Sequence, residues 1–275
     1  MAREAVPKEQ KKDRMLFGGM ARWDGLDLFG PGYMSTAYRK KGEIHIRVES
    51  SNLWRPKNPM VLRASELPVL RSFFFWGRLL TQVVGSAWTL VFFAVTMAVL
   101  WIFVSLMQLG SGGGGVLGGA FGFFAAFPIL PILILFFAVM KFGPLGRYHG
   151  AEHKSVAAYE EYGEVTLENA KKASRIHPRC GTNILAYIIL AALLDPIIGW
   201  WGYAILQFIL ISEAWFIFGK SRPSIAVGNF LQKYFTTTEP RRAELEVAVA
   251  SMNQLLEAEE GKKIGESRVT MPARF

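Results

Sequence analysis

The feature that most restricts the fold of this chain is a long stretch without charge. From residue 79 to residue 140 there is no Asp, Glu, Lys or Arg. A helix that crosses a bilayer needs about 20 consecutive apolar residues, whereas a soluble core helix does not need so long an uncharged run. The stretch is broken by the sequence GSGGGG at 110–115, which is too flexible to continue a helix. It therefore predicts two membrane spans, at about residues 82–108 and 116–140.

A second apolar region covers residues 183–218 and is interrupted by Asp195-Pro196 and by the sequence GWWG at 199–202. The tryptophan pair is typical of a turn at a membrane interface, which would give two short crossings. The alternative is a re-entrant hairpin in which Asp195 faces protein or water. The fold class is therefore expected to be mainly α, a multi-pass membrane protein with about four membrane-crossing or re-entrant helices and a small α+β portion outside the membrane.

The distribution of charge predicts the orientation. Residues 1–78 carry 15 Lys/Arg against 8 Asp/Glu, residues 141–182 carry 7 against 5, and residues 220–275 carry 9 against 7. The positive-inside rule then places both termini and the central loop on the cytoplasmic side of a bacterial inner membrane. The net charge of +9 suits anionic lipid. Because the basic residues are scattered among acids, no nucleic-acid partner is expected.

The parts outside the membrane contain recognisable local signals. The segments MSTAYRK and EIHIRVES flank Lys41-Gly42 and predict a β-hairpin. Helices are expected at 66–81, lying on the membrane surface, at 147–161, at 167–175 capped by Thr166, and at 240–260. The first 14 residues lack the apolar core of a signal peptide. The predicted segments are 1–15, a disordered arm; 16–65, a glycine-rich loop and the hairpin; 66–140, the surface helix and two spans; 141–182, the central loop; 183–219, the helical hairpin; and 220–275, a tail with an amphipathic helix.

The central loop contains the strongest chemical signal, the sequence YHGAEHK at 148–154. His149 and His153 are four residues apart and so share one face of a helix, with Glu152 between them. This H-x-x-E-H order is the inverted form of the zinc-protease motif, in which two His bind the metal and the Glu acts as general base. Such five-residue patterns also arise by chance on solvated helix faces.

Further ligand types follow in the same region. His177 and Cys180, the sole cysteine, lie three residues apart, and imidazoles with a thiolate make a good tetrahedral zinc set. Glu213 is an acid within the last apolar segment, where such a residue is costly and is a functional candidate by default. Its alternative role is to hydrogen-bond another helix. The predicted metal ligands are drawn from His149, His153, His177, Cys180 and Glu213, with Glu152 as the catalytic base and zinc as the favoured ion.

Four motifs of the chain resemble those of the YqhQ-like bacterial membrane proteins. YHGAEHK at 148–154 and HPRCGT at 177–182 look like that family's two most distinctive motifs, and LQKYFTTTEP at 231–240 resembles its C-terminal signature. GGMARWDGLDLFGP at 18–31 resembles its N-terminal motif, with Met20, Asp24 and Phe29 where the family usually has Gln, Glu and Arg. The resemblance covers roughly residues 16–256. It implies metal dependence and names no reaction.

Three functions are consistent with these observations. The first is a metal-dependent inner-membrane hydrolase with one coordination position open at the cytoplasmic membrane surface. The second is a non-enzymatic scaffold or regulator in which His149, His153, His177 and Cys180 close the shell of a structural metal. The third, ranked last, is a transporter with Asp195 and Glu213 as polar groups on its path. The expected partner is the lipid bilayer; the sequence leaves a homo-oligomer open and names no substrate.

Overall fold

The computed structural model describes residues 15–51, 58–83, 129–198, 204–261 and 266–269, with five isolated positions between 102 and 123. Several predictions from the sequence concern residues that are not described. These are most of the arm at 1–15, most of the span at 82–108, the beginning of the span at 116–140, the loop at 110–115 and the whole GWWG turn at 199–202. The chain divides into two compact units. We call residues 1–52, 137–182 and 226–275 the sheet unit, and residues 53–136 and 183–225 the helical unit.

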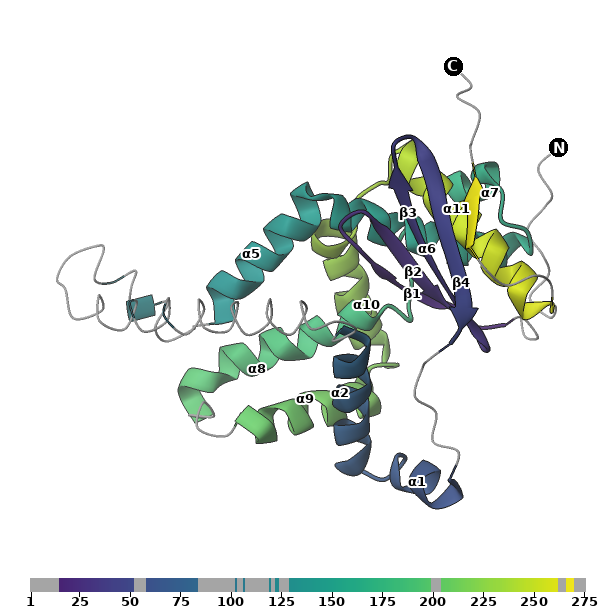
Figure 1. Cartoon of the computed structure of the whole chain (residues 1–275). Coiled ribbons are helices and arrows are strands. Elements are labelled where there is room, and N and C mark those ends of the chain that lie inside the picture. Colours follow the sequence, from purple (N-terminus) through teal and green to yellow (C-terminus); the bar gives the residue numbers. More distant parts are fainter. Residues whose placement is uncertain are drawn as a thin grey trace. The chain divides into compact units, whose positions relative to one another are not determined.

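The sheet unit is built on a five-stranded antiparallel sheet with the order β1-β2-β3-β4-β5 (Figure 1). Its strands are β1 (Gly18–Ala21), β2 (Gly25–Phe29), β3 (Tyr33–Lys40), β4 (Glu43–Ser50) and β5 (Glu266–Val269). The predicted hairpin is confirmed, because β3 pairs with β4 in the register Lys40↔Glu43. Lys41 and Gly42 both have positive φ, 51° and 87°, as the favoured two-residue hairpin turns require.

The first two strands correct the prediction of a glycine-rich loop before the hairpin. Residues 18–29 form β1 and β2 because their glycines permit close contact between backbones. A Cβ atom on Gly25 would lie 2.0 Å from the carbonyl oxygen of Ala37 on β3. The glycines at these positions therefore belong to a sheet rather than to a loop.

Two long helices cover one face of this sheet. They are α6 (Pro144–Tyr162) and α11 (Arg242–Glu259), which pack against each other and against β1 to β4 (Figure 1). The strands alternate accordingly, and Ile44, Ile46 and Val48 of β4 are buried while Arg47 is exposed. The short helix α7 (Leu167–Lys172) packs on α6 and α11, and the hydroxyl of its N-cap Thr166 accepts a hydrogen bond from Asn169 N, as predicted.

The remaining helix of the sheet unit connects to a rare local structure. Helix α10 (Arg222–Leu231) continues into η3 (Gln232–Thr236), a single turn of π-helix. Such turns are uncommon and occur frequently at functional sites. The chain is extended from Thr237 until α11 begins.

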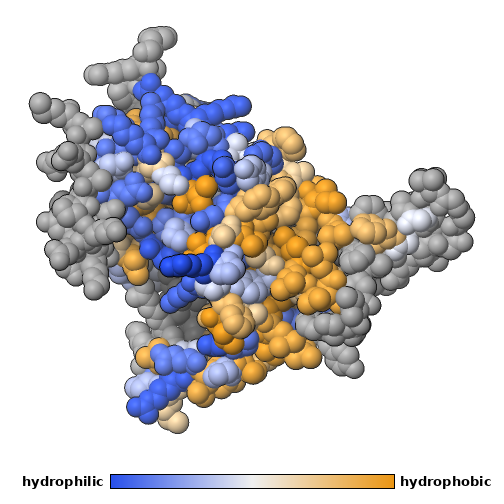
Figure 2. All heavy atoms as spheres, turned by 180° about the vertical axis from the view of Figure 1, so that it is seen from behind, coloured by the Kyte–Doolittle hydropathy of each residue, from blue (hydrophilic) through white to orange (hydrophobic). Residues whose placement is uncertain are grey.

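The helical unit consists of apolar helices. Its helices are α1 (Pro59–Ala64), α2 (Leu70–Val83), the beginning of α5 (Ile129–Phe142), the end of the 3-10 turn η1 (Gly181–Ile184), α8 (Leu185–Ile198) and α9 (Ala204–Phe218). Helix α9 packs against both α2 and α8. In Figure 2, hydrophobic residues, drawn in orange, gather on the face of the molecule that is in view.

The structure supports only part of the predicted membrane architecture. Among the described residues, no single helix is long and apolar enough to cross a membrane. The pair Leu130–Phe142 and Pro144–Tyr162, bent by 67°, meets the requirement in length and composition when both halves are taken together. The apolar helices Gly181–Leu194 and Leu206–Phe218 are shorter. The described residues are thus mainly helical with a sheet near the N-terminus, and four clear spans are not found among them.

Candidate metal centre

Helix α6 carries the first three residues of the candidate site. Pro144 occupies its first turn, and Gly163 ends it in the left-handed conformation, with φ 76°. His149, Glu152 and His153 lie in its buried middle, and the two imidazole centroids are 4.4 Å apart. The expectation that the two histidines share one helix face is therefore confirmed.

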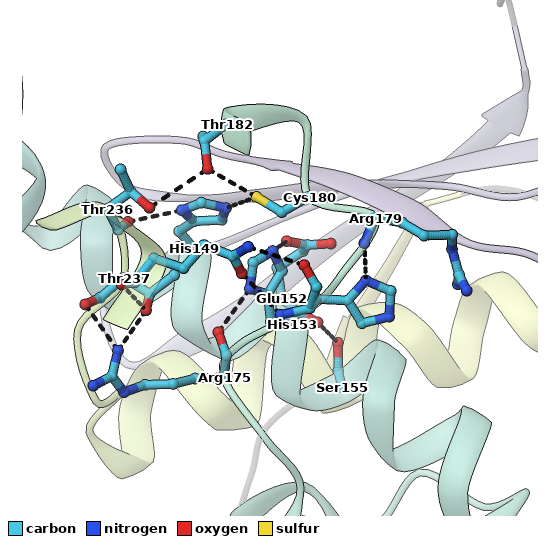
Figure 3. A network of polar contacts seen from close by, with 12 residues as sticks. His149, Glu152, His153, Ser155, Arg175, Arg179, Cys180, Thr182, Thr236 and Thr237 are labelled. Carbon is cyan, nitrogen blue, oxygen red and sulfur yellow. Dashed lines mark hydrogen bonds and ion pairs between the residues drawn. The ribbon is translucent and has the colours of Figure 1, made fainter. Parts of the chain in front are cut away.

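The chain then returns to place Cys180 beside the two histidines. One ligand atom from each of His149, His153 and Cys180 lies within 4.8 Å of the others, and all three residues are buried. The thiol sulfur is 3.3 Å from Nε2 of His149 (Figure 3). Residues separated by about thirty positions in the sequence thus form one compact group with the geometry of a metal-binding site. We call these three residues the donor group.

Backbone carbonyl groups fix both imidazoles in the same tautomer. Nδ1 of His149 is 2.8 Å from the carbonyl oxygen of Thr236, and Nδ1 of His153 is 2.7 Å from that of Arg175. A carbonyl oxygen can only accept a hydrogen bond, so each Nδ1 carries the hydrogen and donates it. Each Nε2 then carries a lone pair instead of a hydrogen, and that of His149 faces the Cys180 thiol. Histidines that bind metals almost always donate their other ring nitrogen to such a partner.

The thiol of Cys180 has a second neighbour. The hydroxyl oxygen of Thr182 lies 3.0 Å from the sulfur and 3.5 Å from the hydroxyl of Thr236 (Figure 3). A hydroxyl that donates to sulfur stabilises the thiolate form, which is the form that binds metals. Burial lowers the pKa of His153 below its ordinary value, and the hydrogen bond with Cys180 opposes this shift. A neutral imidazole is the form that a metal requires.

Glu152 lies next to the donor group and is almost fully buried, at 5% exposure. Its Oε2 is 3.4 Å from Nε2 of His153. Burial raises the pKa of its carboxyl, and the charges of His149 and His177 oppose the shift. The side chain fits here because Gly19 of β1 faces it: a Cβ at Gly19 would lie 2.5 Å from Cγ of Glu152. The N-terminal glycine motif therefore makes room for the glutamate of the central motif.

Two glycines in α6 bring the C-terminal motif against the site. A Cβ on Gly150 would lie 2.3 Å from the carbonyl oxygen of Thr238, and Gly146 O accepts a 2.8 Å hydrogen bond from Thr238 N. The extended chain after η3 can therefore lie directly on the helix, which places Thr236 O at His149. Glu239 secures the same segment through an ion pair of 2.9 Å with the buried Lys154.

His177 lies near the donor group but is engaged elsewhere. Its Nε2 is 3.1 Å from Oε2 of Glu160, and its Nδ1 accepts a 3.3 Å hydrogen bond from Arg179 N. Gln232 of η3 binds both the amide N–H and the carbonyl of His177, at 2.8 and 3.0 Å. Burial alone would raise the pKa of Glu160, but hydrogen bonds from His177 and Arg179 outweigh it and lower that pKa. With both ring nitrogens used, His177 holds the loop rather than joining the donor group.

Glu213, the other predicted ligand, lies on α9 in the helical unit. Its carboxylate accepts hydrogen bonds from Arg71 at 2.5 to 3.1 Å, from the Ser72 hydroxyl at 2.6 Å and from Val69 N at 3.0 Å. Val69 is strained, with φ 70° in a β-branched residue. Glu213 thus has the partners of an acid that fastens the start of α2 to α9, which is the structural alternative named above.

The residues that sequence reasoning missed are partners rather than ligands. Thr182, Thr236 and the carbonyl of Arg175 were not identified as parts of the site. The only sequence signals were indirect: HPRCGT and LQKYFTTTEP stood out as motifs, but nothing indicated which atoms they contribute. A backbone carbonyl has no signature in a sequence.

The donor set fits a divalent cation. Two neutral imidazoles, a thiolate and the carboxylate of Glu152 would together bring two negative charges into a buried site. Such charges are costly in a protein interior unless they are paired or bind a metal. A divalent ion would balance them, and the described residues around the donor group can therefore hold one.

The fold and the site together define a class of protein. A β-sheet unit contains the buried His–His–Cys donor group and the adjacent glutamate, and the rest of the chain is rich in apolar helices. Residues 78–258 match the family described as "Protein of unknown function (DUF1385)", and this is more than half of the chain. The protein belongs to that family.

The curated proteins include a relative in Bacillus subtilis (strain 168), the "Uncharacterized protein YqhQ". It is 35% identical over 130 residues, which cover 41% of this chain and 41% of the relative. The match thus spans less than half of the relative's length. The predicted resemblance to the YqhQ-like family is confirmed. No solved structure matches the chain.

Proposed function

We propose that this protein is a metal-dependent hydrolase of a bacterial cytoplasmic membrane, with zinc bound by His149, His153 and Cys180. One observation carries the proposal: both imidazoles donate Nδ1–H to backbone carbonyls, which leaves each Nε2 without a hydrogen and close to the Cys180 sulfur. Two imidazoles and a thiolate favour zinc over harder ions, which prefer oxygen ligands.

The proposed chemistry assigns separate roles to the residues. A zinc ion in the donor group would supply Lewis-acid activation of water. Glu152 would act as general base, because its carboxylate is held beside His153, 3.4 Å from Nε2, where it could take a proton from a water molecule bound next to the donor group. Thr182 would hold the Cys180 sulfur in its thiolate form through the contact of 3.0 Å.

The hydrogen-bond partners of His177 favour a catalytic metal centre over a structural one. A structural zinc site has four protein ligands, and a catalytic site keeps one position open. His177 was the fourth ligand of the structural alternative, and its ring nitrogens contact Glu160 and Arg179 instead. The transport alternative loses support as well, because Arg71 already compensates the charge of Glu213.

The membrane setting is proposed from the sequence and from the helical unit. The charge-free stretch, the short apolar helices and the many exposed large hydrophobic side chains of that unit support a membrane-embedded chain. We propose that it crosses the membrane several times, with both termini and the sheet unit on the cytoplasmic side, as the positive-inside rule indicates.

The test separates a general base from a ligand by comparing Glu152→Gln with wild type. Both proteins, purified in detergent, are loaded with Co²⁺ and examined for the thiolate-to-cobalt charge-transfer band. They are then assayed with zinc against a panel of activated esters, anilides and phosphoesters. We expect the variant to keep the cobalt spectrum and to lose about 100-fold or more of any hydrolysis, the usual contribution of a general base.

Two outcomes would overturn the assignment. If Glu152→Gln loses the cobalt spectrum, Glu152 is a ligand or a structural partner. If the variant hydrolyses the panel as fast as wild type, the activity does not use this carboxylate and the proposed mechanism fails.

A further inference from the structure

Exposed aromatic side chains gather on the element that supports the donor group. Phe230 of α10 and Tyr234 and Phe235 of η3 are exposed by 53, 46 and 36%. The ring centroid of Phe230 is 4.9 Å from that of Tyr234 and 6.0 Å from that of Phe235. We call these three residues the aromatic face. Phe137 of α5 extends it, with its centroid 4.9 Å from that of Phe235.

Cations lie in the segments that form the aromatic face. Within the sheet unit, residues 137–147 and 226–236, which supply these aromatic rings, contain three Lys or Arg residues and no Asp or Glu. One of the three, Arg147, pairs with Glu244 of α11. The ammonium group of Lys233 lies 5.3 Å from the ring centre of Tyr234. Aromatic residues flanked by cations are typical of the boundary between a bilayer and water, where the rings lie among headgroups and the cations meet anionic lipid.

The same element fixes the donor group. Phe235 directly precedes Thr236, whose carbonyl accepts the hydrogen bond from Nδ1 of His149. Gln232, one turn earlier, holds His177 through two hydrogen bonds. A surface that binds lipid would therefore act on the turn of π-helix that orients a proposed metal ligand.

We propose that the aromatic face lies in the headgroup layer of an anionic bilayer. This placement does not rest on the proposed function. A lipid surface is the partner of choice because the face combines exposed rings with cations and lacks acids, whereas a second copy of this face would repel it through the same positive charge.

The experiment uses a photoreactive residue in the full-length protein. Tyr234→Bpa and, in a second variant, Phe230→Bpa carry p-benzoylphenylalanine on the aromatic face, and Glu257→Bpa on the exposed side of α11 is the control. Each protein is reconstituted into vesicles of phosphatidylcholine with phosphatidylglycerol, irradiated and analysed by mass spectrometry. We expect lipid adducts at positions 234 and 230 and none at 257.

The charge of the face gives a second readout. In the Tyr234→Bpa background, Lys233→Gln should reduce the preference for phosphatidylglycerol adducts by about fivefold, the factor for about 1 kcal/mol per basic residue at an anionic surface. Adducts without any preference for anionic lipid would overturn the charge argument. Adducts between protein chains, or equal lipid labelling at 257, would overturn the lipid-facing surface.

Zinc measured in the same samples separates the two proposals. Lipid adducts with no bound zinc would contradict the proposed function and leave the lipid-facing surface standing. Bound zinc without lipid adducts would contradict the lipid-facing surface and leave the metal centre standing.

Discussion

The sheet unit and the helical unit differ in how far they bury their hydrophobic side chains. The main buried cluster of the described residues lies in the sheet unit, between its strands and helices α6 and α11. Most of the exposed large hydrophobic side chains belong to the helical unit, on α1, α2, α8 and α9. The sheet unit is thus built as a water-exposed domain is, whereas the helical unit presents the surface of a chain that meets lipid or another protein.

Each unit also contains one of the two acids that the sequence marked as candidates for the site, and these two acids differ in their partners. Glu213 in the helical unit accepts hydrogen bonds from Val69, Arg71 and Ser72. Glu152 in the sheet unit is more deeply buried, and its carboxylate lies 3.4 Å from the imidazole of His153.

The partners of a buried acid distinguish a structural carboxylate from one that takes part in chemistry. A buried carboxylate that already has a guanidinium partner is compensated, so it needs no metal. A buried carboxylate beside two imidazoles and a thiol gains its compensation when a cation binds. The proposed division of roles follows: Glu213 fastens helices, and Glu152 performs chemistry.

The largest effect is expected where the C-terminal motif lies on α6. Gly150→Ala would place a Cβ about 2.3 Å from Thr238 O and force the segment away, taking the Thr236 carbonyl from His149. We expect zinc affinity to fall by about 10- to 100-fold, as is usual for loss of a partner behind a metal ligand. Competition with a zinc chelator measures this. Gly181→Ala is the matched control, because nothing lies within 4 Å of its added Cβ. Equal zinc affinity in the two variants would contradict the account.

A smaller effect, on stability alone, is expected in the helical unit. Glu213→Ala removes the acceptor for Arg71, Ser72 and Val69 and should lower the midpoint of thermal unfolding by several degrees. The zinc content should not change. Glu213→Gln, which keeps a carbonyl oxygen, should fall between the variant and wild type. Loss of zinc at unchanged stability would show that Glu213 is a ligand after all and would erase the contrast between the two acids.

The smallest effect is expected at the thiolate. Thr182→Val keeps the shape of the side chain and removes the hydroxyl 3.0 Å from the Cys180 sulfur. We expect zinc affinity to fall several-fold, because the sulfur that binds the metal loses a hydrogen-bond partner. Thr182→Ser should restore the affinity. Unchanged zinc affinity in the valine variant would remove Thr182 from the site.

The elements that sequence reasoning located were those with local signals. Lys41-Gly42 predicted the hairpin because the turn needs two residues with positive φ. Thr166 marked the start of α7. The spacing of His149 and His153 predicted a shared helix face because helical periodicity is local.

The contacts it missed depend on the tertiary fold. The glycines of residues 18–31 indicated a loop, but Gly19 and Gly25 are needed for close approach to Glu152 and to β3. His149 and His177 each lie in one of the motifs that the sequence analysis identified. Their partners, Thr236 O for His149 and Glu160 for His177, distinguish the proposed ligand from the structural residue. The turn of π-helix at η3 has no sequence signal that we could identify.

The most direct test of the metal centre is the zinc content of the purified protein. Wild type and His153→Ala are purified side by side from zinc-containing medium in one detergent, and metal per chain is measured by elemental analysis, with circular dichroism to compare folding. The account predicts about one zinc per wild-type chain and a near-complete loss in a folded variant, because a catalytic site with three protein ligands does not tolerate losing one. Equal zinc in both proteins, or none in the wild type, would contradict it.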